Sequence, residues 1–150
     1  MRHAVETVAE AWSEIVPLAR AHHAEHGIRW PFDPQRKFYD ALEQVEALAL
    51  YTMRDEAGSL WGYATFVVSR HPHFDCLMAA QDTVYVAQAK RGLPGGKFLV
   101  WTDRQLQARG VQQVLRLRAA GWPDGGLKRL GYVPGDGLMV KQFGGGHGTR

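Results

Sequence analysis

The sequence predicts an α/β (α+β) fold in which a mixed, mostly antiparallel sheet is flanked by helices on both faces. Three observations support this class. Apolar residues follow helical periodicity over residues 4–46, and two strand-like segments follow over residues 47–69. A strand, a glycine-rich loop and a helix then succeed one another over residues 82–109. This order favours a layered domain in which helices pack on a sheet.

The first predicted helix covers residues 4–26. Val8, Trp12 and Ile15 recur at steps of three and four residues, which places them on one apolar face. Pro17 lies inside this segment and has no N–H to donate to the helical ladder. We therefore expect the helix to be kinked or divided there.

A second helix is predicted to begin at Asp33–Pro34 and to run to about Glu46. Asp is a favourable N-cap residue, and proline is tolerated at the first helical position. The preceding loop, residues 28–34, carries Trp30 and Phe32. These two aromatic side chains are expected either to pack against the domain or to line a cleft.

The strands follow in the second half of the chain. Residues 47–54 and 60–69 are predicted to form a hairpin, and a third strand covers residues 82–86. A helix over residues 95–109 connects this strand to another at 111–118. A strand–helix–strand connection of this kind is a right-handed crossover between parallel strands.

The C-terminal part is predicted to contain a short helix at residues 122–130 and two final strands at 132–133 and 138–143. A chain of 150 residues fits one compact domain, which we assign to residues 1–143. The glycine-rich residues 144–150 are expected to be a flexible tail.

Charge and cysteine content limit the class of partner. The formal net charge is +3, and the longest basic cluster is Lys90–Arg91 with Lys97 nearby, which fits a phosphate-bearing small molecule better than nucleic acid. The single cysteine, Cys76, excludes an intramolecular disulfide. The sequence shows neither a secretory signal nor a membrane-spanning stretch. We expect a cytoplasmic protein with no membrane or nucleic-acid partner.

The glycine-rich loop is the main candidate for ligand binding. The first amides of a helix lack intrahelical acceptors, and glycines let a phosphate approach them closely. Arg91 and Lys97 add positive charge beside them. An alternative is an ordinary strand–helix turn. A P-loop is excluded because position 91 is not glycine and Phe98 replaces the Ser or Thr that binds magnesium.

This region resembles the acyl-CoA-binding motif of the GNAT superfamily. In that family a strand, here Asp82–Val86, leads into an Arg/Gln-x-x-Gly-x-Gly/Ala loop that opens a helix. Arg91 and Gly96 match the first and last positions of the loop, whereas Pro94 replaces the middle glycine. Gly62–Tyr63 resembles a further motif of the family, and so does Leu130–Gly131–Tyr132.

The likeness is greatest to small acetyltransferases of phage and prophage genomes, which share a His-x-His-aromatic loop such as His71, His73 and Phe74. The resemblance implies acetyl-CoA or coenzyme A as cofactor and two splayed parallel strands around it. No first strand is evident before residue 4, so the sheet is expected to be one strand short. The implied cofactor-binding residues are Tyr85, Val86, Arg91, Gly92, Gly95, Gly96 and Lys97.

The implied reaction is attack of an amine on a thioester, which needs a group that takes the amine proton. Asp82 is one candidate, and the alternative is that it only accepts a backbone hydrogen bond at the strand start. His73 is another, and the alternative is a surface histidine. Many family members carry a tyrosine as general acid where this chain has Leu127.

A second pattern suggests zinc chemistry. The segment His22–His26 matches H-x-x-E-H, and its two outer histidines share a helix face. A catalytic zinc needs a third protein ligand. No spacing argument selects Glu43 or Glu46 for that role, so we assign no metal and interpret the segment as a solvated helix end.

These observations lead to one principal prediction. The chain is expected to be an N-acetyltransferase that moves an acetyl group from acetyl-CoA to an unidentified amine by direct attack. The alternative is a GNAT-like domain that binds CoA or a protein partner without catalysis. The expected partners are acyl-CoA and an amine acceptor, and proteins that resemble this one commonly form homodimers.

Overall fold

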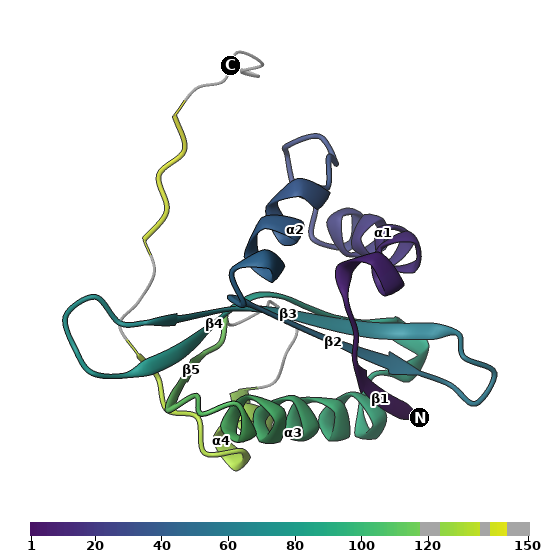
Figure 1. Ribbon diagram of the computed structural model, residues 1–150. Coiled ribbons are helices and arrows are strands. Elements are labelled where there is room, and N and C mark those ends of the chain that lie inside the picture. The colour runs from purple at the N-terminus through teal and green to yellow at the C-terminus, as the bar shows by residue number, and fades with distance from the viewer. Residues whose placement is uncertain (118–123, 136–138, 144–150) are drawn as a thin grey trace. The chain divides into compact units, whose positions relative to one another are not determined.

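The computed structural model describes residues 1–117, 124–135 and 139–143. The chain separates into two compact units, residues 1–119 and 120–150, and each is described by itself. The first unit contains a five-stranded sheet in the order β1-β2-β3-β4-β5 (Figure 1). Its strands are β1 (Arg2–Val5), β2 (Leu48–Arg54), β3 (Leu60–Arg70), β4 (Leu77–Val86) and β5 (Gln113–Leu115).

The sheet is mixed, as the sequence predicts. Neighbouring strands from β1 to β4 are antiparallel. The strands β4 and β5 are parallel, and Met78–Ala80 pairs with Gln113–Leu115. Helix α3 (Leu93–Ala108) connects these two strands, which confirms the predicted crossover. β5 is shorter than the predicted strand over residues 111–118.

Helices cover both faces of the sheet. In Figure 1, α1 (Val8–Glu25) and α2 (Arg36–Gln44) lie on one face and α3 lies on the other. Side chains of β2 alternate between two cores. Leu48 and Leu50 pack with α1, whereas Ala49, Tyr51 and Met53 pack with Phe98 and Leu106 of α3. Every residue of β2 is buried because both faces are covered.

The N-terminus differs from the prediction. Residues 2–5 form strand β1 on the edge of the sheet, so the sheet is not one strand short. The helix begins only at Val8 because Thr7 and Glu10 form a reciprocal capping box. Pro17 lies inside α1 without dividing it.

The second helix also begins later than predicted. Its first residue is Arg36, and its N-cap residue Gln35 makes no side-chain capping bond. The Asp33–Pro34 start is therefore wrong. These two residues belong to the connection before α2, where they line a pocket. The third strand is longer than predicted and begins at Leu77, because its first half pairs with the end of β3.

The second unit contains helix α4 (Asp124–Arg129), within the predicted span. The described residues 132–135 and 139–143 form no strand, contrary to prediction. Residues 122, 123 and 138 and the predicted tail 144–150 lie outside the described residues, and a single domain over residues 1–143 stays a prediction. No helix within the described ranges has the length and apolarity needed to cross a membrane.

Candidate functional site

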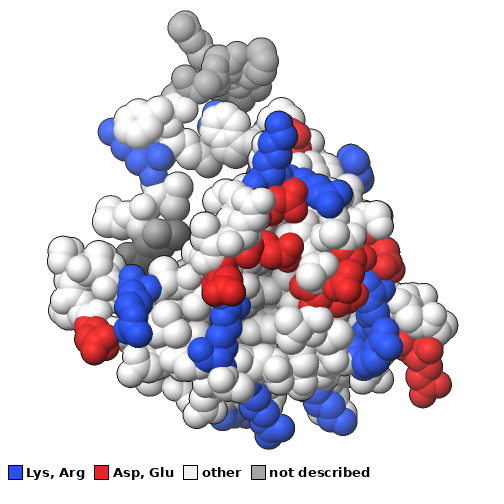
Figure 2. Space-filling view, viewed as in Figure 1, with Lys and Arg blue, Asp and Glu red and all other residues white. Residues whose placement is uncertain are grey.

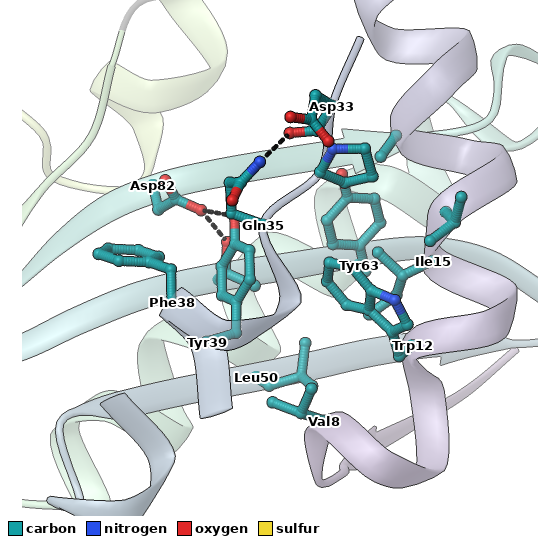
Figure 3. Close-up of a pocket in the computed structure, with 14 residues that line it drawn as sticks. Val8, Trp12, Ile15, Asp33, Gln35, Phe38, Tyr39, Leu50, Tyr63 and Asp82 are labelled. Atoms are coloured by element: carbon teal, nitrogen blue, oxygen red, sulfur yellow. Dashed lines mark hydrogen bonds between the residues drawn. The ribbon is translucent and has the colours of Figure 1, made fainter. Parts of the chain in front are cut away.

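A pocket of about 490 Å³ lies between the sheet and the helices α1 and α2 (Figure 3). Trp12 and Ile15 of α1 line one side, and Phe38 and Tyr39 of α2 line another. Strands β2, β3 and β4 contribute the remaining wall, which includes the carboxylate of Asp82. Pockets of this size accept small organic ligands.

The Asp82 carboxylate is held through one of its two oxygens. Oδ2 accepts a hydrogen bond from the Tyr39 hydroxyl at 2.7 Å and another from the Thr65 hydroxyl at 2.8 Å. The Thr83 hydroxyl lies 3.4 Å from the same oxygen. Among the described residues, no side chain donates to Oδ1. Asp82 is solvent-exposed, so Oδ1 is accessible to a ligand in the pocket.

A β-bulge directs Asp82 into this pocket. In the register of β3 and β4, Thr65 pairs with Thr83 and Phe66 pairs with Gln81, so Asp82 is the extra residue. Without the bulge, alternation would place Asp82 on the same face as Val84 and Val86, which pack toward α3. Bulges often redirect a side chain in this way near functional sites.

The tyrosines around Asp82 stay protonated. Burial raises the pKa of Tyr39 well above its ordinary value, and the hydrogen bond to Asp82 raises it further. Burial, followed by the charge of Asp82, raises the pKa of Tyr63 in the same direction. Tyr39 therefore remains a hydrogen-bond donor to the carboxylate at neutral pH.

The outer edge of β4 is open beside this pocket. Within the described residues, β4 pairs with β5 only at Met78–Ala80. Ala87 N donates a hydrogen bond to Trp61 O, so the backbone of residue 87 faces β3. In an antiparallel pair the residues that face the neighbouring strand alternate with residues that face away from it. The backbone groups of Val84 and Val86 therefore face the open edge of β4. The Val86 carbonyl indeed accepts a bond from Arg91 Nε at 2.9 Å.

The glycine-rich loop leads from this edge into α3. Gly92 is the N-cap residue and has a φ of 84°, which glycine adopts without strain. The amide of Gly96 makes the first helical hydrogen bond, to the Gly92 carbonyl at 2.8 Å. The N–H groups of Leu93 and Gly95 come before it in the chain and have no acceptor within the helix. Pro94 has no amide hydrogen. A Cβ at Gly96 would meet nothing within 4 Å, which leaves open space beside the helix start.

Arg91 is held against the end of α1. Its Nη2 lies 2.6 Å from Glu25 Oε2, and the Tyr85 hydroxyl donates to Glu25 Oε1 at 2.7 Å. The hydrogen bond from Arg91, and then that from Tyr85, lowers the pKa of Glu25. The side chains of Tyr85 and Val86 are buried, so a ligand at the open edge meets the backbone of these residues. The Lys97 side chain is exposed.

The structure does not bring the two predicted bases together. His73 lies in the exposed loop between β3 and β4, where its amide bonds to His71 Nδ1. That loop ends at Leu77, five residues before Asp82, which is roughly 17 Å along an extended strand. The residues that hold Asp82, Tyr39 and Thr65, were missed by the sequence analysis. No sequence motif marks them, because the contact depends on tertiary packing.

The histidine segment forms no metal cluster within the described part of the chain. The rings of His22 and His26 lie 4.4 Å apart in an edge-to-face arrangement. Burial, and then the neighbouring charge of His26, lowers the pKa of His22. In the described ranges, no group of three or more His, Cys, Asp or Glu side chains could hold a metal ion.

Charges on the visible surface are interspersed. On the face drawn in Figure 2, described Lys and Arg side chains alternate with Asp and Glu rather than gathering in one place. The exclusion of nucleic acid as the main partner stays a prediction.

Comparison with known proteins shows the fold. No family model and no curated protein matches the sequence. The structure resembles ribosomal-protein-alanine N-acetyltransferase from Brucella melitensis, with a TM-score of 0.67, 21% identity and coverage of 95% of this chain and 100% of the other. It also resembles glucosamine-6-phosphate N-acetyltransferase from Arabidopsis thaliana (TM-score 0.72, 11% identity, coverage 95% and 98%).

A third similar structure is an aminoglycoside acetyltransferase from an uncultured soil metagenomic sample, in complex with sisomicin (TM-score 0.68, 15% identity, coverage 95% and 93%). The chain therefore has the fold of GNAT acetyltransferases. The three similar proteins differ in the acceptor that their names indicate, so the fold leaves the acceptor open.

Proposed function

We propose that the chain is an acyl-CoA-dependent N-acyltransferase that moves an acetyl group to an amine bound in the Asp82 pocket. The shared acetyltransferase fold supports the general reaction. The observation that carries the proposal is the position of Asp82. Its carboxylate lines a pocket on one face of β4, while the open edge of the same strand leads to the glycine-rich loop.

The residues of the loop fit a nucleotide-linked pyrophosphate. The amides of Leu93 and Gly95 precede the first helical hydrogen bond, and the helix dipole adds partial positive charge there. The space at Gly96 is open and the exposed Lys97 provides positive charge nearby, whereas the charge of Arg91 is already paired with Glu25. Pro94 removes one amide from this set. Backbone groups of Val84 at the open edge are suited to hydrogen bonds with the pantetheine amides or the acyl carbonyl.

Acetyl-CoA, when bound, would supply the thioester carbonyl that the amine attacks. The ammonium group first loses one proton to solvent, and the neutral amine nitrogen then forms a bond to this carbonyl carbon while the C–S bond breaks with its electron pair leaving on sulfur. Asp82 Oδ1 accepts the proton that the amine loses, because Oδ2 already accepts bonds from Tyr39 and Thr65. The thiolate takes up a proton from water, since a thiol of pKa about 8.5 is a tolerable leaving group.

The test measures CoA release from acetyl-CoA with primary amines, together with thermal unfolding with and without acetyl-CoA. Saturation at about one hundred times Kd should add roughly 2.7 kcal/mol of stability. An unfolding midpoint that rises with acetyl-CoA and CoA, but not with ATP, would support the loop assignment. If acetyl-CoA did not raise the unfolding midpoint, the proposal would be wrong.

The Asp82→Asn variant tests the base. We expect it to lower kcat by about 10²–10⁴-fold while acetyl-CoA still raises the unfolding midpoint. His73→Ala is the matched comparison and should keep wild-type activity. The reverse result, with His73→Ala inactive and Asp82→Asn active, would assign the base to the hairpin loop instead.

A second candidate function is CoA binding without catalysis, which Pro94 and Leu127 favour. It predicts acetyl-CoA stabilisation without CoA release at any amine. A cytoplasmic location and a homodimer, as well as the likeness to phage and prophage enzymes, stay predictions.

A further inference from the structure

We infer that the acceptor is a small primary monoamine with an apolar body, and not a polycationic, hydroxyl-rich or phosphorylated amine. This inference rests on the proposed function, because it assigns the Asp82 pocket to the acceptor.

The walls of the pocket are mainly apolar and aromatic. Val16 and Ile15 line it from α1, and Leu50 lines it from β2. The rings of Trp12 and Tyr39 lie 5.7 Å apart, and those of Tyr39 and Phe38 lie 5.4 Å apart, so the three form a continuous aromatic wall. An apolar acceptor body gains free energy when it leaves water for such a surface.

The charges in the pocket favour a cationic head group. Asp82 and Asp33 are the acidic side chains that line it, and no Lys, Arg or His is among the described lining residues. A phosphorylated amine would therefore bring negative charge to two carboxylates with no cation to pair with. Asp33 and Asp82 are both solvent-exposed. An exposed ion pair between Asp33 and a second ammonium group contributes little because solvent screens it, so a second amino group gains less in this pocket than an apolar chain end does.

Few polar groups remain for a hydroxyl-rich acceptor. The hydroxyls of Tyr39 and Thr65 already donate to Asp82, and the Gln35 amide donates to the Asp33 carbonyl, which leaves the Tyr63 hydroxyl as the main donor for a ligand. Sugar hydroxyls placed against Ile15 and Leu50 would lose hydrogen bonds to water without replacement. Unpaired polar groups of this kind weaken binding strongly.

Three amines with the same number of heavy atoms test this inference directly. They are n-hexylamine, 5-amino-1-pentanol and 1,5-diaminopentane. We expect kcat/KM to be at least tenfold higher for hexylamine than for the other two. Along n-propylamine to n-hexylamine, whose amino groups share nearly the same pKa, kcat/KM should rise about fourfold for each methylene.

A pocket variant separates apolar binding from chemistry. Phe38 is half exposed on α2, so Phe38→Ala should fold. We expect it to lower kcat/KM for hexylamine about tenfold through KM while kcat is retained. Phe74→Ala is the matched control, since Phe74 is an exposed aromatic residue in the β3–β4 loop outside the pocket.

Calorimetry of the CoA-saturated protein with the same three amines provides a readout that needs no turnover. The inference is supported if hexylamine binds more tightly than the other two amines, and if Phe38→Ala weakens this binding whereas Phe74→Ala does not. A preference for the diamine or the amino alcohol, in turnover or in binding, would overturn it while acetyl transfer stands. Failure of acetyl-CoA to bind would instead overturn the proposed function.

Discussion

Asp82 depends on neighbouring side chains for the direction of its carboxylate. Tyr39 comes from α2 and Thr65 from β3, and both bond to Oδ2. A carboxylate held on one oxygen keeps the other in a defined direction. Tyr39 is therefore a positioning residue for the proposed base, and its raised pKa keeps it a donor.

Replacing Tyr39 with Phe removes one of these hydrogen bonds and keeps the aromatic wall. We expect kcat to fall about fivefold, which corresponds to the loss of one hydrogen bond of about 1 kcal/mol, with KM for acetyl-CoA unchanged. Tyr51→Phe is the control, because Tyr51 is buried on the α3 face of the sheet. Equal losses in both variants, or a change only in stability, would contradict a positioning role.

At the scale of elements, the glycines at the N-cap and in the first turn of α3 serve different structural roles. Gly92 has a positive φ that other residues adopt only with strain, whereas Gly96 lies in the helix with open space around it. Gly62 of β3 is required for a third reason, which is close packing. A Cβ there would lie only 3.1 Å from the Tyr85 carbonyl oxygen of β4. The strands β3 and β4 thus lie too close together at Gly62 to admit a side chain there.

Gly92→Ala and Gly96→Ala should change stability in opposite directions. We expect Gly92→Ala to lower the free energy of unfolding by about 1–3 kcal/mol because of backbone strain. Gly96→Ala should raise it by about 0.5–1 kcal/mol, since alanine is the better helix former. Urea unfolding measures both. A stable Gly92→Ala protein with unchanged acetyl-CoA affinity would show that the loop geometry is not needed.

At the scale of the whole first unit, one buried arginine connects several elements. Arg54 of β2 bonds to Glu6 before α1, to Glu14 within α1 and to the Gly58 carbonyl in the β2–β3 turn. Burial raises the pKa of Glu6, but hydrogen bonds and charge, chiefly from Arg54, outweigh it and leave this pKa below its ordinary value of 4.5. This cluster anchors α1 and the segment between β1 and α1 to the end of β2.

The Glu6 pKa gives stability a defined pH dependence. A lowered folded-state pKa contributes stability above pH 4.5, and that contribution is lost as pH falls through the folded value. Glu6→Gln should therefore be about 1–2 kcal/mol less stable than wild type at pH 7, and this difference should shrink as pH falls below 4.5. Glu56→Gln, at an exposed turn, is the control. A difference that does not shrink as pH falls would contradict the ionic origin.

Local sequence signals determined much of the fold. Apolar periodicity predicted the helices of the first unit, and the β2–β3 hairpin follows from its β-branched and aromatic residues. The strand, glycine loop and helix were predicted in order, because turn chemistry and helix propensity act over a few residues. The capping box of Thr7 and Glu10 was also present in the sequence and would have predicted the start of α1 correctly.

The tertiary structure alone decided the site. Strand β1 is only four residues long and exists because it pairs with β2, and the first half of β4 depends on pairing with β3. The bulge at Asp82 depends on that same register, and it turns the carboxylate from the α3 face to the pocket. Hydrogen bonds from Tyr39 and Thr65 join residues 43 and 17 positions from Asp82. Residue type alone carries no information about such distant partners, because register and packing arise only when the whole sheet forms.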